Sequence, residues 1–484
     1  MLTRGVLGSV LVLLGGLVVS PLPRSVPILG GEQLAVLREH TAGRMVGLAV
    51  VLVGLGLLAH AWLALCRSVA GAGDGAAQDV ALGLVRRAAL LWSVPLLPAP
   101  PLFSRDGWSY AAQGMLVQVG VSPYEHGPGV LTGPIVEAVD PRWMATPAPY
   151  GPLPLIFGDL GAGLTGNPWA LVVGHRMVAL IGLVLLAWAV PRMAAWTGAG
   201  PALASAVVLA SPLMVANGVG GLHNDLLMVG LMAAALVAAV ERGWVAGAVL
   251  GGLAAAVKLP GGLICVLVVL VSLPAGALLV DRLRRTALVA AVSVGALVGT
   301  GLLWGLGVGW VDALGVPASI DTLLSAPTQV GRVLDWASAT LGTGLQPTAF
   351  RDLVRTLAMV ALVALAGWTV LRRPTGDPPG AVRGAAVLVG ATLLLSPVVH
   401  LWYLLWLVPF LAALRLGRAG TAALVAVCVL AGLVAPLDSS LHGAYLAVVG
   451  GALTVAALVA VLLLTRHGRE RVRTIAEAGL VKVP

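Results

Sequence analysis

The stretch HNDLLMVGLMAAALVAAVERGWVAGAVLGGLAAAVKLP, residues 223–260, decides the fold class of this chain. It covers nearly all of two apolar runs, 222–241 and 243–258, which are separated only by Arg242. Runs of this composition are typical of helices that lie in a lipid bilayer. Because the turn between them is minimal, the two helices must run antiparallel.

Ionisable residues lie at the ends of these two helices that are remote from the turn. Asp225 comes 16 residues before Glu241, and Lys258 comes 15 residues after Gly243. At 1.5 Å per residue, each lies roughly 23 Å from the turn, so we predict that Lys258 is level with Asp225 and His223. A lone Lys can simply extend toward the membrane surface, but ionisable residues at membrane depth tend to be functional.

The composition of the whole chain indicates a membrane protein. Of its 484 residues, 59% are hydrophobic and 10% are charged, a balance that excludes an ordinary water-soluble globular protein. The formal net charge is +9, but 27 of the 29 basic residues are Arg, and they are scattered between apolar runs. We interpret them as topology signals and expect no nucleic-acid partner.

The apolar runs predict an all-α polytopic membrane protein with about 14 transmembrane helices. The candidate spans are residues 6–22, 44–66, 84–102, 168–190, 201–219, 222–241, 243–258, 261–280, 286–309, 353–371, 381–397, 399–414, 420–435 and 444–465. Two long hydrophilic stretches remain, 103–167 after the third span and 310–352. We predict one transmembrane domain over residues 1–484, with a basic tail at 466–484.

The charge distribution predicts the orientation of the chain. With both termini in the cytoplasm, the cytoplasmic segments carry 19 Lys and Arg residues and the external segments carry 10. Acidic residues have the opposite bias, with 13 outside and 7 inside. The positive-inside rule therefore favours a multi-pass protein of the plasma membrane with cytoplasmic N- and C-termini and both long loops on the external side.

The first external loop combines a carboxylate with aromatic residues and prolines. Asp106 comes directly beyond the third apolar run, and Tyr124 and Tyr150 lie in proline-containing segments further along the loop. Sugars are often held by aromatic faces and carboxylates, whereas Trp and Tyr also form ordinary belts at the membrane surface. The residues by themselves leave both interpretations open.

Two more polar clusters are expected at the same outer end. The segment His-Asn-Asp at 223–225 opens an apolar run, where helix capping explains one polar residue better than three in succession. In the turn between two later runs, His400 is followed closely by Trp402 and Tyr403. The convergence of three clusters on one side indicates a functional site there.

These segments together resemble one known family. The resemblance rests on Ser104-Arg105-Asp106, Ser122-Pro123-Tyr124, Thr146 to Pro152, His223-Asn224-Asp225 and His400 to Trp406, and it covers about residues 80–465. The family is the actinobacterial α-1,6-mannosyltransferases of MptA/MptB type, which use polyprenyl-phosphate mannose. Trp108 and Leu401 depart from the family pattern, which commonly has Tyr and Pro there.

The resemblance implies a GT-C glycosyltransferase fold and a hexosyltransferase of the cell envelope. Such an enzyme transfers mannose to the 6-hydroxyl of an α-1,6-mannan acceptor, the backbone of lipomannan and lipoarabinomannan. It also supports Asp106 as the catalytic base. For the departing phosphate we expect Lys258, assisted by Arg105 and His223. The other expected substrate contacts are Asn224, Asp225, Tyr124, Tyr150, His400, Trp402 and Tyr403.

The expected chemistry needs few other components. One base without a second carboxylate nucleophile fits a single displacement with inversion. The spacing of Cys, His, Asp and Glu indicates no metal site, so we expect no metal and no cofactor beyond the lipid-linked donor. The expected partners are polyprenyl-phosphate mannose, a lipoglycan acceptor and membrane lipids.

Two alternatives remain open from the sequence. One is a GT-C transferase for another polyprenyl-phosphate sugar, such as arabinofuranose. The other is a lipid-linked sugar flippase or transporter, although transporter sites usually lie near the bilayer midplane. Here the polar clusters gather at one surface beside long loops, which favours a surface enzyme.

Overall fold

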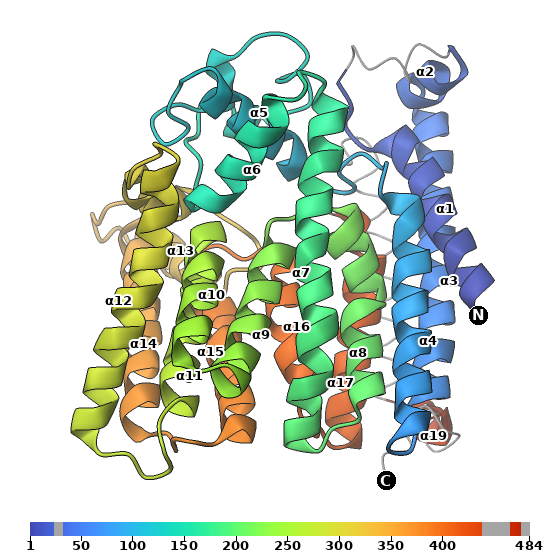
Figure 1. Cartoon of the computed structure of the whole chain (residues 1–484). Coiled ribbons are helices and arrows are strands. Elements are labelled where there is room, and N and C mark those ends of the chain that lie inside the picture. The colour runs from blue at the N-terminus through green and yellow to red at the C-terminus, as the bar shows by residue number, and fades with distance from the viewer. Residues whose placement is uncertain (24–31, 438–464, 476–484) are drawn as a thin grey trace.

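The computed structural model describes residues 1–23, 32–437 and 465–475, and these segments are almost entirely helical. Apolar helices stand side by side in a bundle, and shorter helices cover one of its ends (Figure 1). The prediction of an all-α protein is therefore confirmed for the described residues, in which no β-strand occurs.

Six helices in the described part of the chain are long and apolar enough to cross a membrane. They are α1 (Leu2–Val19), α3 (Thr41–Val69), α7 (Pro168–Thr197), α12 (Leu279–Leu303), α14 (Ala349–Arg372) and α15 (Pro378–Leu395). A bent pair, α8 (Pro201–Leu209) and the π-helix η5 (Met214–Gly220), adds a seventh candidate with an angle of 55° between its parts. These helices are consistent with the expected multi-pass membrane protein.

Other expected apolar runs form helices that are shorter or, in α4, more charged. These are α4 (Ala76–Ser93), α9 (Asp225–Glu241), α10 (Trp244–Val257), α11 (Ile264–Val271), α16 (Leu404–Ala412) and α17 (Arg418–Leu433). The expected run 444–465 lies, apart from its last residue, outside the described residues. The total of about 14 crossings therefore stays a prediction.

The first expected loop contains two α-helices and forms one end of the bundle. It contains α5 (Asp106–Gln118) and α6 (Pro152–Ala162), which lie together beside the upper part of α7 and above α9 and α10 (Figure 1). The two helices touch at a pair of glycines, because a Cβ atom on Gly158 would lie 2.7 Å from the Cα of Gly114. We call this the α5 end of the bundle.

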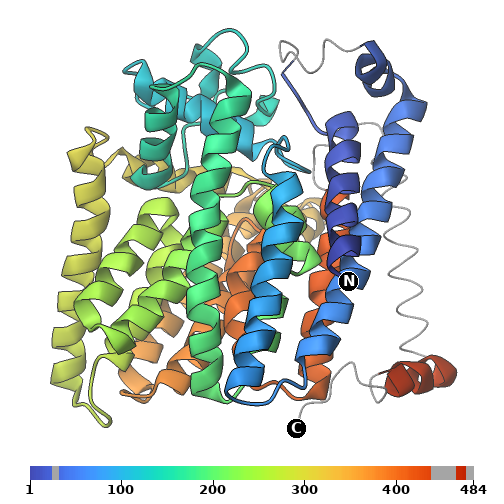
Figure 2. The ribbon, with the colours of Figure 1, turned by 45° about the vertical axis from the view of Figure 1, so that its right-hand side comes forward.

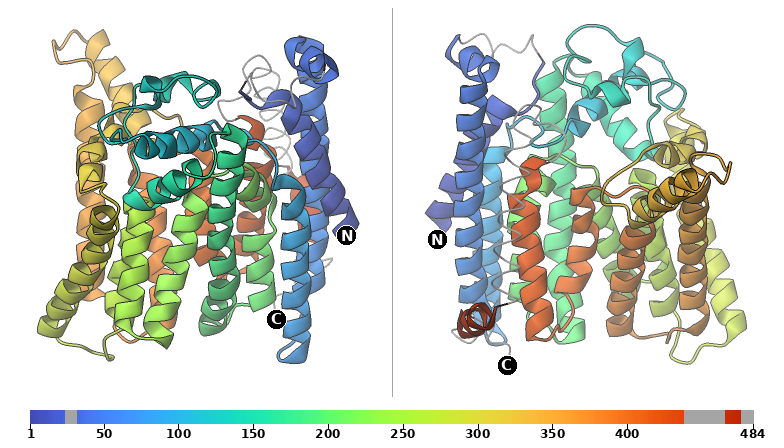
Figure 3. Two further views of the ribbon diagram at one scale, coloured as in Figure 1. Left: turned by 45° about the horizontal axis from the view of Figure 1, so that its top comes forward. Right: turned by 180° about the vertical axis from the view of Figure 1, so that it is seen from behind.

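The second expected loop folds at the same end. It contains the 3₁₀ segment η7 (Gly309–Ser319) and α13 (Ala326–Thr340), which packs against α14 and crosses it near the α5 end (Figure 3). Ser325 begins α13 by accepting a hydrogen bond from the Thr328 N–H through its side chain. Both hydrophilic stretches therefore meet on one side of the molecule.

The remaining described elements are short. They are α2 (Glu32–Glu39), η2 (Val94–Leu96), η3 (Pro128–Val130), η4 (Pro141–Trp143), η6 (Leu259–Leu263), η8 (Leu401–Tyr403), η9 (Ala435–Leu437) and α19 (Arg466–Ile475). The basic helix α19 lies at the end opposite α5, while α1, α2 and α3 stand at one edge of the bundle (Figure 2).

Helix α9 forms the centre of the core. Its residues from Asp225 to Ala239 are all buried, and it packs against α7 on one side and α10 on another. The chain reverses at Gly243, whose φ of 100° favours glycine, and then enters α10. The predicted antiparallel pair is thus confirmed.

Candidate functional site

The predicted register of α9 and α10 brings a cation and an anion together. Lys258, the residue that ends α10, places its Nζ 3.0 Å from Oδ1 of Asp225, the first residue of α9. The Asp225 side chain is 1% exposed and that of Lys258 is 14% exposed. A buried charge of either sign is costly without a partner, so the pair stabilises both groups at the α5 end of the helices.

Aromatic side chains surround the Lys258 ammonium. The Tyr403 ring centroid lies 4.2 Å from Nζ, that of Trp406 lies 5.2 Å away and that of Tyr150 lies 5.8 Å away. Lys258 Nζ also donates to the Tyr403 hydroxyl at 3.0 Å. Cation–π attraction in such a partly desolvated box fixes the position of the positive charge. The described contacts use two of the three ammonium N–H groups.

Asp225 has a second donor besides Lys258. The indole Nε1 of Trp406 donates to Oδ1 at 2.7 Å. Neither Asp225 nor Asn224, which precedes α9, makes a side-chain capping hydrogen bond to that helix. The capping explanation is therefore wrong for both residues. Asn224 is buried, and its Nδ2 has no protein partner among the described residues.

Asp106 begins α5 and faces the loop before α9. Its Oδ2 lies 3.4 Å from Nδ1 of His223, an ion-pair distance with poor alignment for a hydrogen bond. The Tyr110 hydroxyl donates to the same oxygen at 3.5 Å, and the Tyr150 hydroxyl donates to that of Tyr110 at 3.5 Å. The carboxylate remains 16% exposed, so a small group can reach it.

Two opposing effects set the pKa of Asp106. Burial favours the neutral acid and would raise the pKa, but contact with His223 and the nearby charges of His400 and Lys258 outweigh burial. The pKa of Asp106 therefore lies below the ordinary value for an aspartate. The group is a carboxylate, and hence a proton acceptor, at neutral pH.

A continuous stack of rings joins two distant parts of the chain. The His223 ring stacks on Trp402 with a centroid distance of 3.9 Å, and Trp402 stacks on His400 at 4.3 Å. Tyr403 stacks on Trp406 at 4.1 Å. The three clusters expected from the sequence thus meet in one site, which combines Asp106, Lys258 and a rigid aromatic surface.

Unusual backbone conformations precede Asp106 and His223, the two polar residues on the α5 side of this site. Phe103, three residues before Asp106, has a φ of 63°, and Leu222, directly before His223, has a φ of 56°. Such angles are unfavourable for residues with side chains, so surrounding contacts must hold them. One such contact is the Leu102 N–H donating to the Gly220 carbonyl at 2.9 Å.

A buried arginine ties these two segments together. Arg176, on α7, is 0% exposed and donates to five backbone carbonyls. The acceptors belong to Leu97, Ala99 and Pro100 on one segment and to Val219 and Gly220 on the other. These bonds occupy all five guanidinium N–H groups.

Two predicted residues lie apart from this group. Tyr124 packs in a separate apolar cluster with Trp310 and Ala313 of η7. Burial lowers the pKa of the Arg105 guanidinium, and the charges that act on it are those of Asp140, which raises the pKa, and Arg142, which lowers it. Asp140 and Arg142 form an ion pair of 2.8 Å. Burial would raise the pKa of Asp140, but the Arg142 contacts lower it. Sugar contact by Tyr124 and phosphate contact by Arg105 stay predictions.

Sequence reasoning left three residues of the site without a role. They are Tyr110, Trp406 and Arg176. For Arg176 a signal existed, because an Arg inside an apolar run is expensive in a membrane and usually functional. In the part of the chain that the structure describes, no group of three or more His, Cys, Asp or Glu side chains is arranged to hold a metal ion. Metal independence stays a prediction.

The sequence matches models of known protein families. The model for the N-terminal domain of the α-(1→6)-mannopyranosyltransferases matches residues 2–274, more than half of the chain. The chain belongs to this MptA/MptB family. The model for the MptB C-terminal domain matches residues 327–479, and that for glycosyltransferase family 87 matches 154–397. The prediction of a glycosyltransferase is confirmed.

Relatives in the family cover most of the chain. A probable α-(1→6)-mannopyranosyltransferase of Mycolicibacterium smegmatis is 32% identical over 86% of this chain and 80% of its own length. The α-(1→6)-mannopyranosyltransferase A of Mycobacterium tuberculosis is 31% identical over 91% of this chain and 85% of its own. The α-(1→6)-mannopyranosyltransferase A of Corynebacterium glutamicum is 30% identical over 76% of this chain and 78% of its own length. No solved structure matches the chain.

Proposed function

We propose that this family member transfers mannose from polyprenyl-phosphate mannose to the 6-hydroxyl of an α-1,6-mannan acceptor, with inversion. The observation that carries the proposal is one accessible carboxylate, Asp106, beside a positive charge fixed in an aromatic box, Lys258. The names of the relatives support mannose as the sugar and an α-1,6 linkage. Lipomannan and lipoarabinomannan backbones are the corresponding acceptors, and a GT-C fold is the corresponding architecture.

The proposed step needs one proton transfer and one substitution. Asp106 accepts the proton of the acceptor 6-hydroxyl while the acceptor oxygen attacks C1 of the donor mannose. The bond from C1 to the phosphate oxygen breaks, and polyprenyl phosphate leaves as an anion. A phosphate is a good leaving group, so the step requires no strong general acid. Attack opposite the leaving group turns a β-linked donor into an α-linked product.

Lys258 suits the departing phosphate. Asp225 and Tyr403 direct two of its N–H groups, which leaves the third for a phosphate oxygen. Because the box holds the ammonium in place before the donor arrives, little reorganisation is needed when negative charge develops. Asp225 then acts by orienting Lys258. Of the three stacked rings, His223 and Trp402 are buried and His400 is half-buried, so His400 is the ring that a sugar can reach.

We also propose that the α5 end faces the outside of the plasma membrane and that both termini are cytoplasmic. The bias of Lys and Arg toward the opposite loops supports this orientation. A transport function is less well supported, because α5, which carries Asp106, lies at one end of the bundle and not near its middle (Figure 1).

The test is a reconstituted transfer reaction. Purified protein receives polyprenyl-phosphate mannose and a short α-1,6-mannoside, and the product is analysed by mass spectrometry and linkage analysis. We expect a lengthened α-1,6-mannoside. Movement of the lipid-linked sugar across a vesicle without bond formation would contradict the proposal. Transfer only from polyprenyl-phosphate arabinofuranose would assign another donor.

A further inference from the structure

A second polar feature lies at the α5 end, outside the group around Asp106 and Lys258. It is a groove of about 370 Å³ between α13, the segment that follows it and the start of α14. Its walls include Asp321, Arg332, Asp335, Trp336, Gln346 and Thr348. None of these residues takes part in the reaction step proposed above.

Hydrogen bonds to the backbone make the walls of the groove rigid. The two carboxylate oxygens of Asp335 accept from the N–H groups of Phe350 and Arg351 at 2.8 and 3.1 Å. The Arg351 guanidinium lies 3.3 Å from the Asp321 carboxylate, which also lines the groove. A preformed groove of this kind binds a ligand without first having to order its own side chains.

The groove is connected to the aromatic part of the candidate site. Thr322, next to Asp321, accepts from the Val399 N–H at 3.0 Å, directly before His400. Thr328 on α13 donates to the Pro397 carbonyl at 2.8 Å. Arg355 on α14 links Asp321, which lines the groove, to Thr328 on α13, because it donates to Asp321 at 2.7 Å and to Thr328 at 3.0 Å. A chain-like ligand that occupies the groove therefore lies close to the loop that carries His400.

The chemistry of the walls fits a neutral sugar chain. Trp336 is 69% exposed, and its broad apolar ring suits the flat C–H face of a hexose. Carboxylates, guanidinium groups and an amide supply acceptors and donors for hydroxyl groups on the same ligand. Asp321 and Asp335 balance the charges of Arg332 and Arg351, so the walls carry no net positive charge for a phosphate.

We propose that this groove binds sugar residues of the mannan acceptor that lie beyond its reactive end. The proposal rests on the proposed function, since it assigns the remote part of the same acceptor. Such a subsite adds binding energy only for acceptors long enough to reach it. It therefore makes the enzyme favour longer chains over short ones.

The experiment compares acceptor lengths in three variants. Trp336→Ala removes the stacking surface, Trp336→Phe keeps an aromatic face, and Trp368→Ala is the matched control. Trp368 is 51% exposed and lies near Arg373 at the other end of α14. KM is measured for a dimannoside, for a hexamannoside and for the donor, and hexamannoside binding is measured by calorimetry.

We expect Trp336→Ala to raise KM and Kd for the hexamannoside about fivefold to tenfold, the effect of roughly one lost stacking contact. KM for the dimannoside and for the donor should not change, and Trp336→Phe and Trp368→Ala should resemble the original protein. An equal rise for both acceptors, or a rise for the donor alone as expected for a Trp at the membrane surface, would overturn the subsite.

Calorimetry separates this proposal from the proposed function. If no mannoside is ever lengthened but the hexamannoside still binds and needs Trp336, the transfer reaction is refuted and the groove stands. If lengthening occurs but hexamannoside binding is the same in Trp336→Ala, the groove is refuted and the transfer reaction stands.

Discussion

The Nε of Arg176 donates to the carbonyl oxygen of Val219 at 3.0 Å. The other N–H groups of this guanidinium reach carbonyls at residues 97–100 and at Gly220. One side chain on α7 thus holds both the segment that leads to Asp106 and the segment that leads to His223. Among the residues that the structure describes, no carboxylate forms an ion pair with Arg176, and the dipoles of these carbonyl groups balance its charge. We regard Arg176 as a positioning residue for Asp106.

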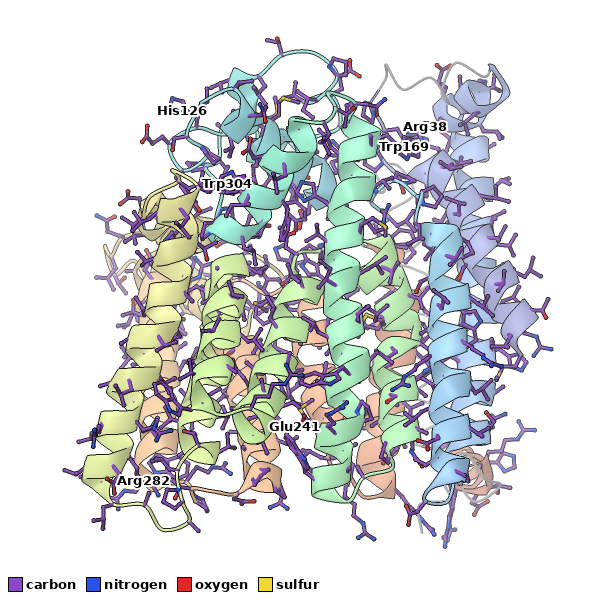
Figure 4. The ribbon with its side chains drawn as sticks, viewed as in Figure 1. Arg38, His126, Trp169, Glu241, Arg282 and Trp304 are labelled. Carbon is purple, nitrogen blue, oxygen red and sulfur yellow. The ribbon has the colours of Figure 1, made fainter. Side chains whose placement is uncertain are left out.

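Replacing Arg176 with Met should therefore lower kcat by about 100-fold, the scale expected when a catalytic group is displaced by about 1 Å. The donor KM should change little, because Lys258 is held by other contacts. Arg282 is the matched control, since it is also buried and donates to the Val370 and Arg373 carbonyls, but at the opposite end of the bundle (Figure 4). Steady-state kinetics and thermal unfolding measure both variants.

A merely structural role for Arg176 predicts another outcome. In that case Arg176→Met and Arg282→Met should lose stability and activity in parallel. Partial recovery of kcat in Arg176→Ala on addition of guanidinium ions, without recovery in an Arg282→Ala control, would support positioning.

Asp106→Asn should reduce mannose transfer by at least about 1000-fold, because the amide cannot accept the acceptor proton. The substitution keeps the size of the side chain, so folding and donor binding should remain normal. Transfer assays and donor binding to the purified variant check this. Near-normal turnover would exclude Asp106 as the base.

Lys258→Ala should have two separate effects. It leaves the Asp225 carboxylate buried without its cation, which should destabilise the protein by about 3 kcal/mol. It also removes the charge for the donor phosphate and should raise the donor KM. The double variant Asp225→Asn, Lys258→Met should recover much of the thermal stability without recovering donor binding. Recovery of both properties together would remove the phosphate role of Lys258.

The low pKa of Asp106 predicts a flat acid side of the pH–rate profile. An aspartate with a depressed pKa stays ionised, so the rate should not fall from its protonation between about pH 8 and about pH 5. Contact with His223 lowers that pKa, so His223→Gln should raise it and move the acid limb to higher pH. Initial rates across this pH range test the shift. If His223→Gln lowers kcat but leaves the acid limb of the pH–rate profile at the same pH, His223 does not act by lowering the pKa of Asp106.

The sequence predicted the parts of the site that follow from helix geometry. Lys258 and Asp225 were expected to be level because a helix rises by a constant amount per residue, and their 3.0 Å contact agrees. The role of Arg176 was not predictable in this way. Its carbonyl acceptors come from two distant segments. A positive φ can be predicted from sequence where the residue is glycine, but Phe103 and Leu222 are not glycines, so their φ values could not be predicted.

The helices at the α5 end were also beyond sequence reasoning. From the sequence, residues 103–167 are predicted to form one hydrophilic loop. In the structure α5 and α6 form within it, because they pack on each other at Gly114 and Gly158. Such packing depends on partners about forty residues apart. The prolines and aromatic residues of the segment do not predict its helices.

The stack of His223, Trp402 and His400 has a consequence for biosynthesis. His223 lies in the part of the chain matched by the N-terminal family model, and the other two rings lie in the part matched by the C-terminal one. While the ribosome is still making the last of these segments, Asp106 and Lys258 have already been synthesised but lack Trp402, Tyr403 and Trp406. A nascent or truncated chain therefore has an incomplete candidate site, which is completed only once both segments have folded together.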